Sequence, residues 1–123
     1  VRQQFGMEAQ FHSLARRPAH FDVDGRITRW NAQAEVMLGW PAAEAVGRSL
    51  ADTLLTARHW ESLSACVKYF AVSGEWPVLN KRIEIAAVRR DGTEFPAELS
   101  IAPARLKDAC LFGAFVRDTY VST

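Results

Sequence analysis

The sequence predicts an α+β fold in which helices pack on one face of a five-stranded antiparallel sheet. Two Asp-Gly pairs, at positions 24–25 and 91–92, each lie between runs with strand character. The interval between these pairs has the periodicity of helices rather than of strands. The chain has 123 residues, enough for one domain around a single hydrophobic core.

The first Asp-Gly pair predicts a hairpin of two short strands. Type I′ turns need positive φ angles, which glycine adopts freely, so Asp-Gly is a strong hairpin signal. Phe21 and Val23 precede the pair, and Ile27 and Trp30 follow it. These apolar residues are spaced as in strands with one buried face.

The second pair opens a meander of three strands. Residues 82–85 alternate polar and apolar side chains before the turn. After it, Phe95, Ala97, Leu99 and Ile101 share one face, and Glu94, Glu98 and Ser100 share the other. Pro96 cannot donate a hydrogen bond, so we expect it at a sheet edge or a bulge. Residues 110–116 are apolar enough for a strand buried on both faces.

Four helices are predicted between the two hairpin turns, each with its own start and stop signals. The longest runs from about residue 57 to 72 and is roughly 24 Å long, enough to cross a small sheet. The signals are Asn31 as N-cap and Gly39 as stop, Pro41 at the first helical position with Gly47 as stop, Ser49 with Asp52 as a capping box, and Thr56 as N-cap with Gly74 as stop.

Composition and charge exclude several classes of protein. The formal net charge is +1, from 15 basic and 14 acidic residues, so a nucleic-acid interface is not expected. Cys66 and Cys110 lie far apart without metal-ligand spacing, which argues against a disulfide framework or zinc site and favours a cytoplasmic location. No apolar run reaches the roughly 20 residues of a membrane helix, and no signal peptide is visible.

The ordered set of these motifs resembles the PAS domain family. "DVDGRITRWNAQAEVMLGW" is similar to the family's first hairpin and following helix, and "PAAEAVGRSLADTL" to its next helices. "RRDGTEFPAELSI" with "FGAFVRD" is similar to its final strands. The resemblance implies a single PAS domain over 1–123, with a leader helix at 1–15, a core at 16–118 and the start of an output linker at 119–123.

The resemblance also implies a pocket between the long helix and the inner face of the sheet. Apolar residues at these spacings also form ordinary cores, so plain packing and a small apolar ligand both remain open. The candidate lining consists of His59, Leu63, Cys66, Val67 and Phe70 from the helix, and Ile83, Ile85, Leu99, Ile101 and Phe115 from the strands.

The sequence leaves the cofactor open and favours none. Haem-binding relatives carry their histidine about eleven residues before the glycine that ends the helix, where this chain has Leu63. His59 lies one turn too early, which disfavours haem. Flavin chemistry of the LOV type is disfavoured because the Asn-Cys-Arg-Phe-Leu-Gln run is absent.

Two functions remain open, and neither is enzymatic, because no GxSxG, HExxH, GxGxxG or P-loop motif occurs. The first is a sensory domain of a larger signalling protein, such as a histidine kinase, cyclase or transcription regulator. The alternative is a ligand-free dimerisation or docking module, and we expect a homodimer through the N-terminal helix or the sheet.

Relatives often end in Asp, an aliphatic residue and Thr before the output helix, but here only Asp118 of Asp118-Thr119-Tyr120 fits.

Overall fold

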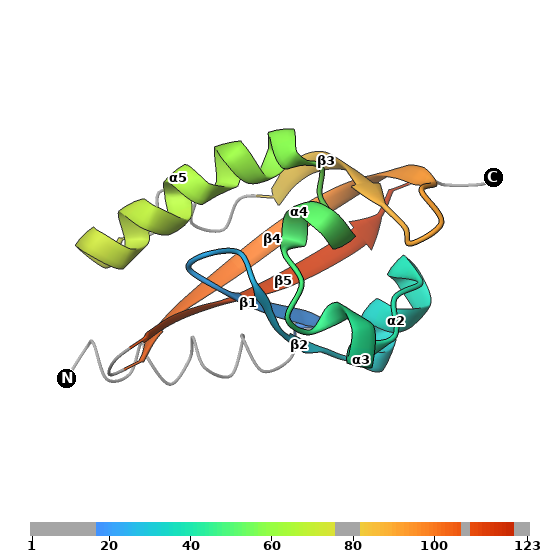
Figure 1. The fold of residues 1–123 in the computed structure, drawn as a ribbon. Coiled ribbons are helices and arrows are strands. Elements are labelled where there is room, and N and C mark those ends of the chain that lie inside the picture. The colour runs from blue at the N-terminus through green and yellow to red at the C-terminus, as the bar shows by residue number, and fades with distance from the viewer. Residues whose placement is uncertain (1–16, 76–81, 107–108, 120–123) are drawn as a thin grey trace.

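Five antiparallel strands form one sheet in a computed structural model that describes residues 17–75, 82–106 (backbone alone for 104–106) and 109–119. The strand order is β2-β1-β5-β4-β3, so the two early strands and the three late strands meet where β1 pairs with β5 (Figure 1). The predicted fold class is confirmed. The strands are β1 (Ala19–Asp22), β2 (Ile27–Trp30), β3 (Arg82–Val88), β4 (Glu94–Leu106) and β5 (Ala109–Asp118).

Four described helices cover the inner face of this sheet. In Figure 1, α2 and α3 lie beside β1 and β2, the long helix α5 covers the other part of the sheet, and α4 lies between them. Buried apolar residues of each helix belong to the same core cluster as those of the strands. The helices are α2 (Ala32–Leu38), α3 (Ala42–Ala45), α4 (Leu50–Thr53) and α5 (Ala57–Ser73).

The helix boundaries largely follow the predicted capping residues. The side chains of Asn31, Ser49 and Thr56 each accept a hydrogen bond from a backbone amide of the helix that follows. Gly39 and Gly74 end their helices in the left-handed conformation, at φ 80° and 77°. The prediction for Pro41 was wrong by one position, because it is the N-cap of α3 and its extended ψ of 146° precedes the helix.

Both Asp-Gly pairs lie in hairpin turns of the same geometry, which differs from the two-residue type I′ turn. The Gly25 amide donates to the Asp22 carbonyl, and the Gly92 amide donates to the Arg89 carbonyl, at 2.9 Å in each case. The glycine follows a β-turn in each hairpin, with φ of 80° and 88°. These are three-residue loops, in which only the last residue needs positive φ.

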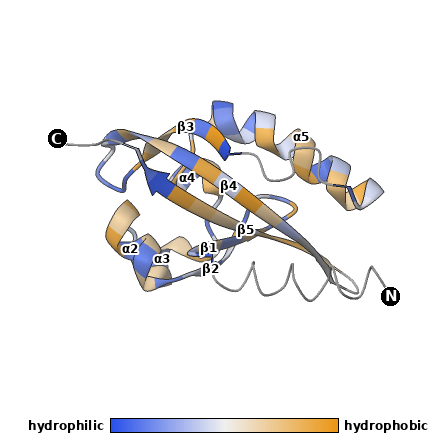
Figure 2. Ribbon diagram, turned by 180° about the vertical axis from the view of Figure 1, so that it is seen from behind, coloured by the Kyte–Doolittle hydropathy of each residue, from blue (hydrophilic) through white to orange (hydrophobic). Residues whose placement is uncertain are grey.

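Side chains alternate between the two faces along the late strands, as predicted for β4. Figure 2, which views the sheet from behind, shows polar and apolar residues alternating along β4. On β5, Phe112, Ala114 and Val116 are buried on the inner face. Phe115 therefore lies on the outer face, where it is 38% exposed. Its predicted place in the pocket is wrong, and so is the prediction that residues 110–116 are buried on both faces.

The expectation that Pro96 lies at a sheet edge is wrong, because its strand β4 lies between β3 and β5. Its carbonyl accepts a hydrogen bond from the Thr119 amide at 3.0 Å, so its nitrogen also faces β5. The register between β4 and β5 begins at the next residue, with Ala97 opposite Asp118. The missing N–H therefore faces the point where β5 ends, one residue beyond the register of β4 and β5.

The predicted leader helix at 1–15 and most of the linker at 119–123 lie outside the described residues. Within the described part of the chain, no helix combines the length and apolar character needed to cross a membrane.

Candidate functional site

The structure brings nine of the ten predicted lining residues to the space between α5 and the inner face of the sheet. Leu63, Val67 and Phe70 lie on the buried face of α5, one or two turns apart. Ile85, Leu99 and Ile101 oppose them from β3 and β4 and are also buried. His59, Cys66 and Ile83 are half-buried at the margin of this space. Phe115 is the exception, because it lies on the opposite face.

An aromatic cluster fills the part of this space next to β1 and β5, and it joins the predicted Phe70 to three residues that we did not predict as part of the site, Phe21, Trp60 and Phe112. Phe21 stacks on Phe112 with ring centroids 5.2 Å apart, and Phe70 meets Phe112 edge-on at 5.6 Å. Trp60 meets Phe21 edge-on at 6.1 Å. Stacked and edge-on pairs are the favourable arrangements for aromatic rings. Strand alternation could have placed Phe112, had the register of the apolar run 110–116 been known.

Trp60 closes one side of this cluster against the first hairpin turn. A Cβ atom on Gly25 would lie 2.6 Å from the Trp60 ring, closer than two atoms can approach. The indole therefore packs directly on the glycine backbone, and it depends on the absence of a side chain there.

His59 forms a polar contact at the start of α5. The Ala86 amide of β3 donates to Nε2 of His59 at 3.4 Å. The acceptor nitrogen carries no proton, so the neutral ring has its proton on Nδ1. Nε2 is therefore engaged by the edge of the sheet.

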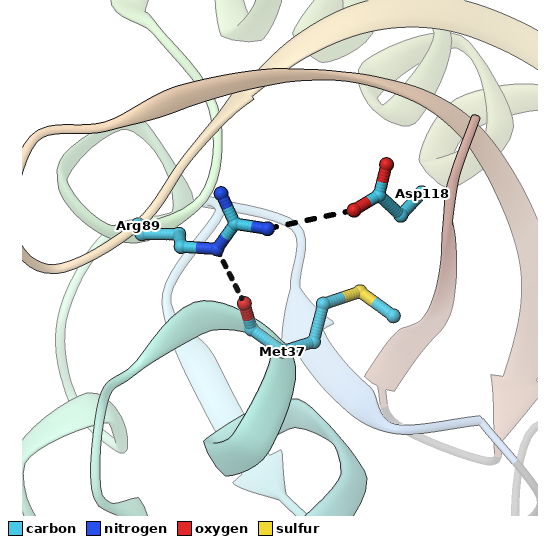
Figure 3. A network of polar contacts seen from close by, with 3 residues as sticks. All are labelled: Met37, Arg89 and Asp118. Carbon is cyan, nitrogen blue, oxygen red and sulfur yellow. Dashed lines mark hydrogen bonds and ion pairs between the residues drawn. The ribbon is translucent and has the colours of Figure 1, made fainter. Parts of the chain in front are cut away.

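Arg89 joins three elements at the other end of the sheet (Figure 3). Its Nε donates to the Met37 carbonyl in the last turn of α2 at 3.2 Å, and its guanidinium pairs with Asp118 at 3.4 Å. The same guanidinium lies 4.0 Å from the ring centroid of Phe95. Asp118, the one residue that fits the family's C-terminal motif, is thereby tied to α2 and to the β3–β4 hairpin.

The outer face of the sheet carries charged groups with shifted pKa values. A hydrogen bond from Arg117 lowers the pKa of Glu98. Arg17 donates to the carbonyl of Ser100 at 2.8 Å and to its hydroxyl at 3.0 Å. Burial lowers the pKa of the Arg17 guanidinium.

A small cavity lies between α2 and the sheet. Its volume is about 10 Å³, which is room for about one water molecule. The lining is apolar apart from Gln33, and it includes Met37, Leu54 and Val116. Within the described residues, no group of three His, Cys, Asp or Glu side chains is placed to hold a metal ion.

A family model described as the PAS fold matches residues 7–119. The chain belongs to the PAS family. It is thus a sensory and signalling module. A protein of Azorhizobium caulinodans, itself uncharacterised, is 32% identical over 97 residues, which cover 79% of this chain and 13% of that protein. This PAS domain therefore spans a small part of the length of its relative.

Several solved PAS structures are similar to this domain in fold. The LOV domain of the blue-light activated histidine kinase EL346 of Erythrobacter litoralis has a TM-score of 0.64 and 19% identity, covering 84% of this chain and 94% of that one. The PAS domain of the Cronobacter turicensis quorum-sensing receptor RpfR, in complex with BDSF, has a TM-score of 0.61 and 17% identity, covering 83% and 91%. The PAS domain of an HTR-like protein of Haloarcula marismortui has a TM-score of 0.61 and 23% identity, covering 95% and 98%. At these identities the likeness concerns the fold alone.

Proposed function

We propose that this PAS domain is a sensory input domain that binds a small apolar molecule between α5 and the sheet. The observation that carries the proposal is the chemistry of the inner face. Its fully buried residues are aliphatic and aromatic, and they come from α5, β1, β3, β4 and β5. A space lined in this way favours a ligand with little polar surface.

The charge distribution supports an uncharged ligand, or one whose charged group stays outside. Within the described residues, the buried side chains facing this space include no Lys, Arg, Asp or Glu. A carboxylate buried there would lack a cationic partner, and unpaired buried charges are costly. His59 cannot supply the charge while its Nε2 accepts the Ala86 amide.

The fold neighbours are compatible with this proposal. The RpfR PAS domain was solved with BDSF and also with C12:0, and the EL346 domain belongs to a blue-light activated histidine kinase. Domains of this fold therefore occur both with bound small molecules and in a light-activated protein. For this chain we propose no haem or flavin, because Nε2 of His59 is engaged and the cysteine-containing run of LOV domains is absent.

The output of the domain is proposed to leave through the end of β5. Asp118 is the last residue of β5, and Arg89 holds it to the Met37 carbonyl of α2 (Figure 3). A ligand that moves the helices would change this set of contacts. We propose that residues 119–123 begin a linker to an output domain of a larger cytoplasmic signalling protein. The much greater length of the Azorhizobium relative is consistent with this organisation.

Native mass spectrometry and an absorption spectrum of the purified domain test the sensing proposal. We expect a co-purified small molecule without a haem or flavin band, and its addition to stripped protein should shift the amide signals of Leu63 and Ile85. A Soret or flavin band would overturn the apolar-ligand proposal.

A pair of tryptophan substitutions then locates the site. Leu63→Trp fills the space beneath α5 and is expected to abolish binding while the domain stays folded. Val72→Trp is the matched control, because Val72 is on the same helix and 85% exposed, and it should bind normally. Equal binding by both variants would place the ligand elsewhere.

The alternative function, a docking or dimerisation module, is supported by the outer face of the sheet. Phe115 is partly exposed there, opposite Ser100, to which Arg17 donates, and next to the Glu98–Arg117 pair. An apolar residue with a polar rim is typical of an interface. We propose a homodimer through this face as the second candidate.

A further inference from the structure

The outward edge of β3 is tied to three different helices. Backbone amides alternate sides along a strand, so every second amide of β3 points away from β4. The Ala86 amide donates to His59 Nε2 of α5 at 3.4 Å, and the Val88 amide donates to the Leu54 carbonyl at the end of α4 at 3.0 Å. Just beyond β3, the Arg90 amide donates to the Leu38 carbonyl of α2 at 2.9 Å.

We call the hydrogen bonds of these three amides the β3 edge contacts. They are connected to the ion pair of Arg89 and Asp118 through the end of α2. Leu38 and Met37 are the last two residues of α2, and the Met37 carbonyl accepts from Arg89. The third edge contact and the Arg89 side chain therefore hold the same end of α2. Asp118, at the end of β5, pairs with that same arginine.

His59 has a singular place in this arrangement. Among the described residues, its bond with Ala86 is the hydrogen bond that joins α5 to a strand. The other described contacts between α5 and the strands are apolar or aromatic, and such contacts tolerate sliding more readily than a directional hydrogen bond does. The imidazole thus sets the position of α5 along β3.

We propose that the β3 edge contacts couple α5 to Asp118, and that His59 is the positioning residue at the start of this coupling. The inference rests on the proposed sensing function only in taking α5 as the element that a ligand moves. A change in the position of α5 along β3 is then transmitted through β3 to Asp118 at the end of β5. A displaced His59 releases Ala86, and the neighbouring amides lose protection with it.

Amide hydrogen exchange measured by NMR on the 123-residue domain tests the coupling without any ligand. His59→Leu removes the acceptor, and His59→Gln offers an amide oxygen in its place. Ser62→Ala is the control, since Ser62 is exposed on the same helix. In His59→Leu we expect protection to fall by about tenfold at Ala86, the equivalent of one hydrogen bond. We expect it to fall at Val88 and Arg90 as well, and the Thr119 amide signal to move.

The glutamine variant separates a coupling role from simple loss of packing. His59→Gln is expected to restore protection at all three amides, and Ser62→Ala to leave them unchanged. Loss of protection at Ala86 alone, with Val88, Arg90 and Thr119 as in the unsubstituted domain, would overturn the proposal. So would an effect of His59→Leu that His59→Gln fails to reduce.

Arg89→Gln provides a test from the other end if His59→Leu does not fold. Coupling between two sites is reciprocal, so loosening Arg89 from Asp118 is expected to lower protection at Ala86 and to shift the His59 ring signals. Unchanged signals at both residues would overturn the coupling. Because no ligand enters these measurements, their failure would leave the sensing proposal standing, and a failed ligand titration would leave the coupling standing.

Discussion

Single residues in this domain act through backbone geometry as much as through side-chain chemistry. Gly25 and Gly92 have the same place in equivalent hairpin loops, with φ of 80° and 88°. Their surroundings differ, because Trp60 packs on Gly25 whereas nothing lies within 4 Å of a Cβ atom on Gly92. The two glycines therefore separate the cost of a strained φ from the cost of a collision.

Gly92→Ala is expected to lower the free energy of unfolding by about 1 kcal/mol, from the left-handed backbone alone. Gly25→Ala should cost a further 1–3 kcal/mol, roughly, because the new methyl group displaces Trp60. Urea denaturation followed by tryptophan fluorescence measures both values. Equal losses in the two variants would show that Trp60 moves away from the new methyl group without lowering the free energy of unfolding.

Asp91 illustrates an electrostatic contribution at the same scale. Hydrogen bonds from the side chain and then from the backbone amide of Thr93 lower the pKa of Asp91, and the amide lies 2.9 Å from its Oδ1. A carboxyl group whose pKa is lower in the folded than in the unfolded state stabilises the fold at pH values above the ordinary pKa of Asp, about 3.9. This stability is lost as the pH falls through the lowered pKa.

Thr93→Val removes the side-chain hydrogen bond and keeps the backbone one, so the pKa of Asp91 should rise but remain below the ordinary range. A carboxyl-carbon NMR titration between about pH 2 and 6 covers the transition. Thr28→Val, at an exposed position on β2, is the control and should leave the Asp91 titration unchanged. An identical midpoint in Thr93→Val and the unsubstituted domain would contradict the assignment.

At the scale of elements, α5 shows how one amphipathic helix defines both a core and a site. Leu63, Val67 and Phe70 face the sheet, whereas Tyr69 and Val72 face outward. This arrangement follows directly from the helical repeat, and so the long helix was predictable. The contacts of its buried face, however, depend on which residues of β5 point inward.

Phe70→Ala is expected to lower the free energy of unfolding by about 3–5 kcal/mol, because it leaves a cavity beside Phe112. Tyr69→Ala, on the adjacent exposed position, should cost no more than about 0.5 kcal/mol. Thermal and chemical denaturation of the two variants provide the comparison. A small loss for Phe70→Ala would indicate that α5 packs loosely on the sheet.

For the whole molecule, the division into two sheet faces decides what each surface can do. The described helices take up the inner face, and the edge of β3 is closed by contacts with α2, α4 and α5. The edge of β2 is met by residues 47–50, where the Ile27 amide donates to the Arg48 carbonyl at 2.8 Å. Partner binding by strand addition at these covered positions is therefore blocked.

Phe115→Glu is expected to convert a homodimer to monomer if the outer face is the interface, because it places a charge in its apolar part. Light scattering at matched concentrations measures the change. Val36→Glu is the control, since Val36 is 87% exposed on α2 and away from the outer face of the sheet. A domain that is monomeric before any substitution would remove the dimer hypothesis.

The local signals in the sequence determined the strands, the helices and most of their caps. Asn31, Thr56, Gly39 and Gly74 act where their side chains or their permissive φ angles suggested, because capping is settled within one or two turns of chain. Nine of the ten proposed lining residues also face inward, since strand and helix periodicity suffices to group them.

Only the tertiary structure decided the facing of Phe115, the place of Pro96 and the contact between Trp60 and Gly25. Residues 110–116 are almost all apolar, so the sequence does not show which alternate residues of the strand face the core. The register against β4 and β1 was needed to show that Phe112 points inward and Phe115 outward. Pro96 is accommodated because β5 ends beside it. The bond from Ala86 to His59 joins residues 27 positions apart, and such a contact exists only once helix and sheet have packed.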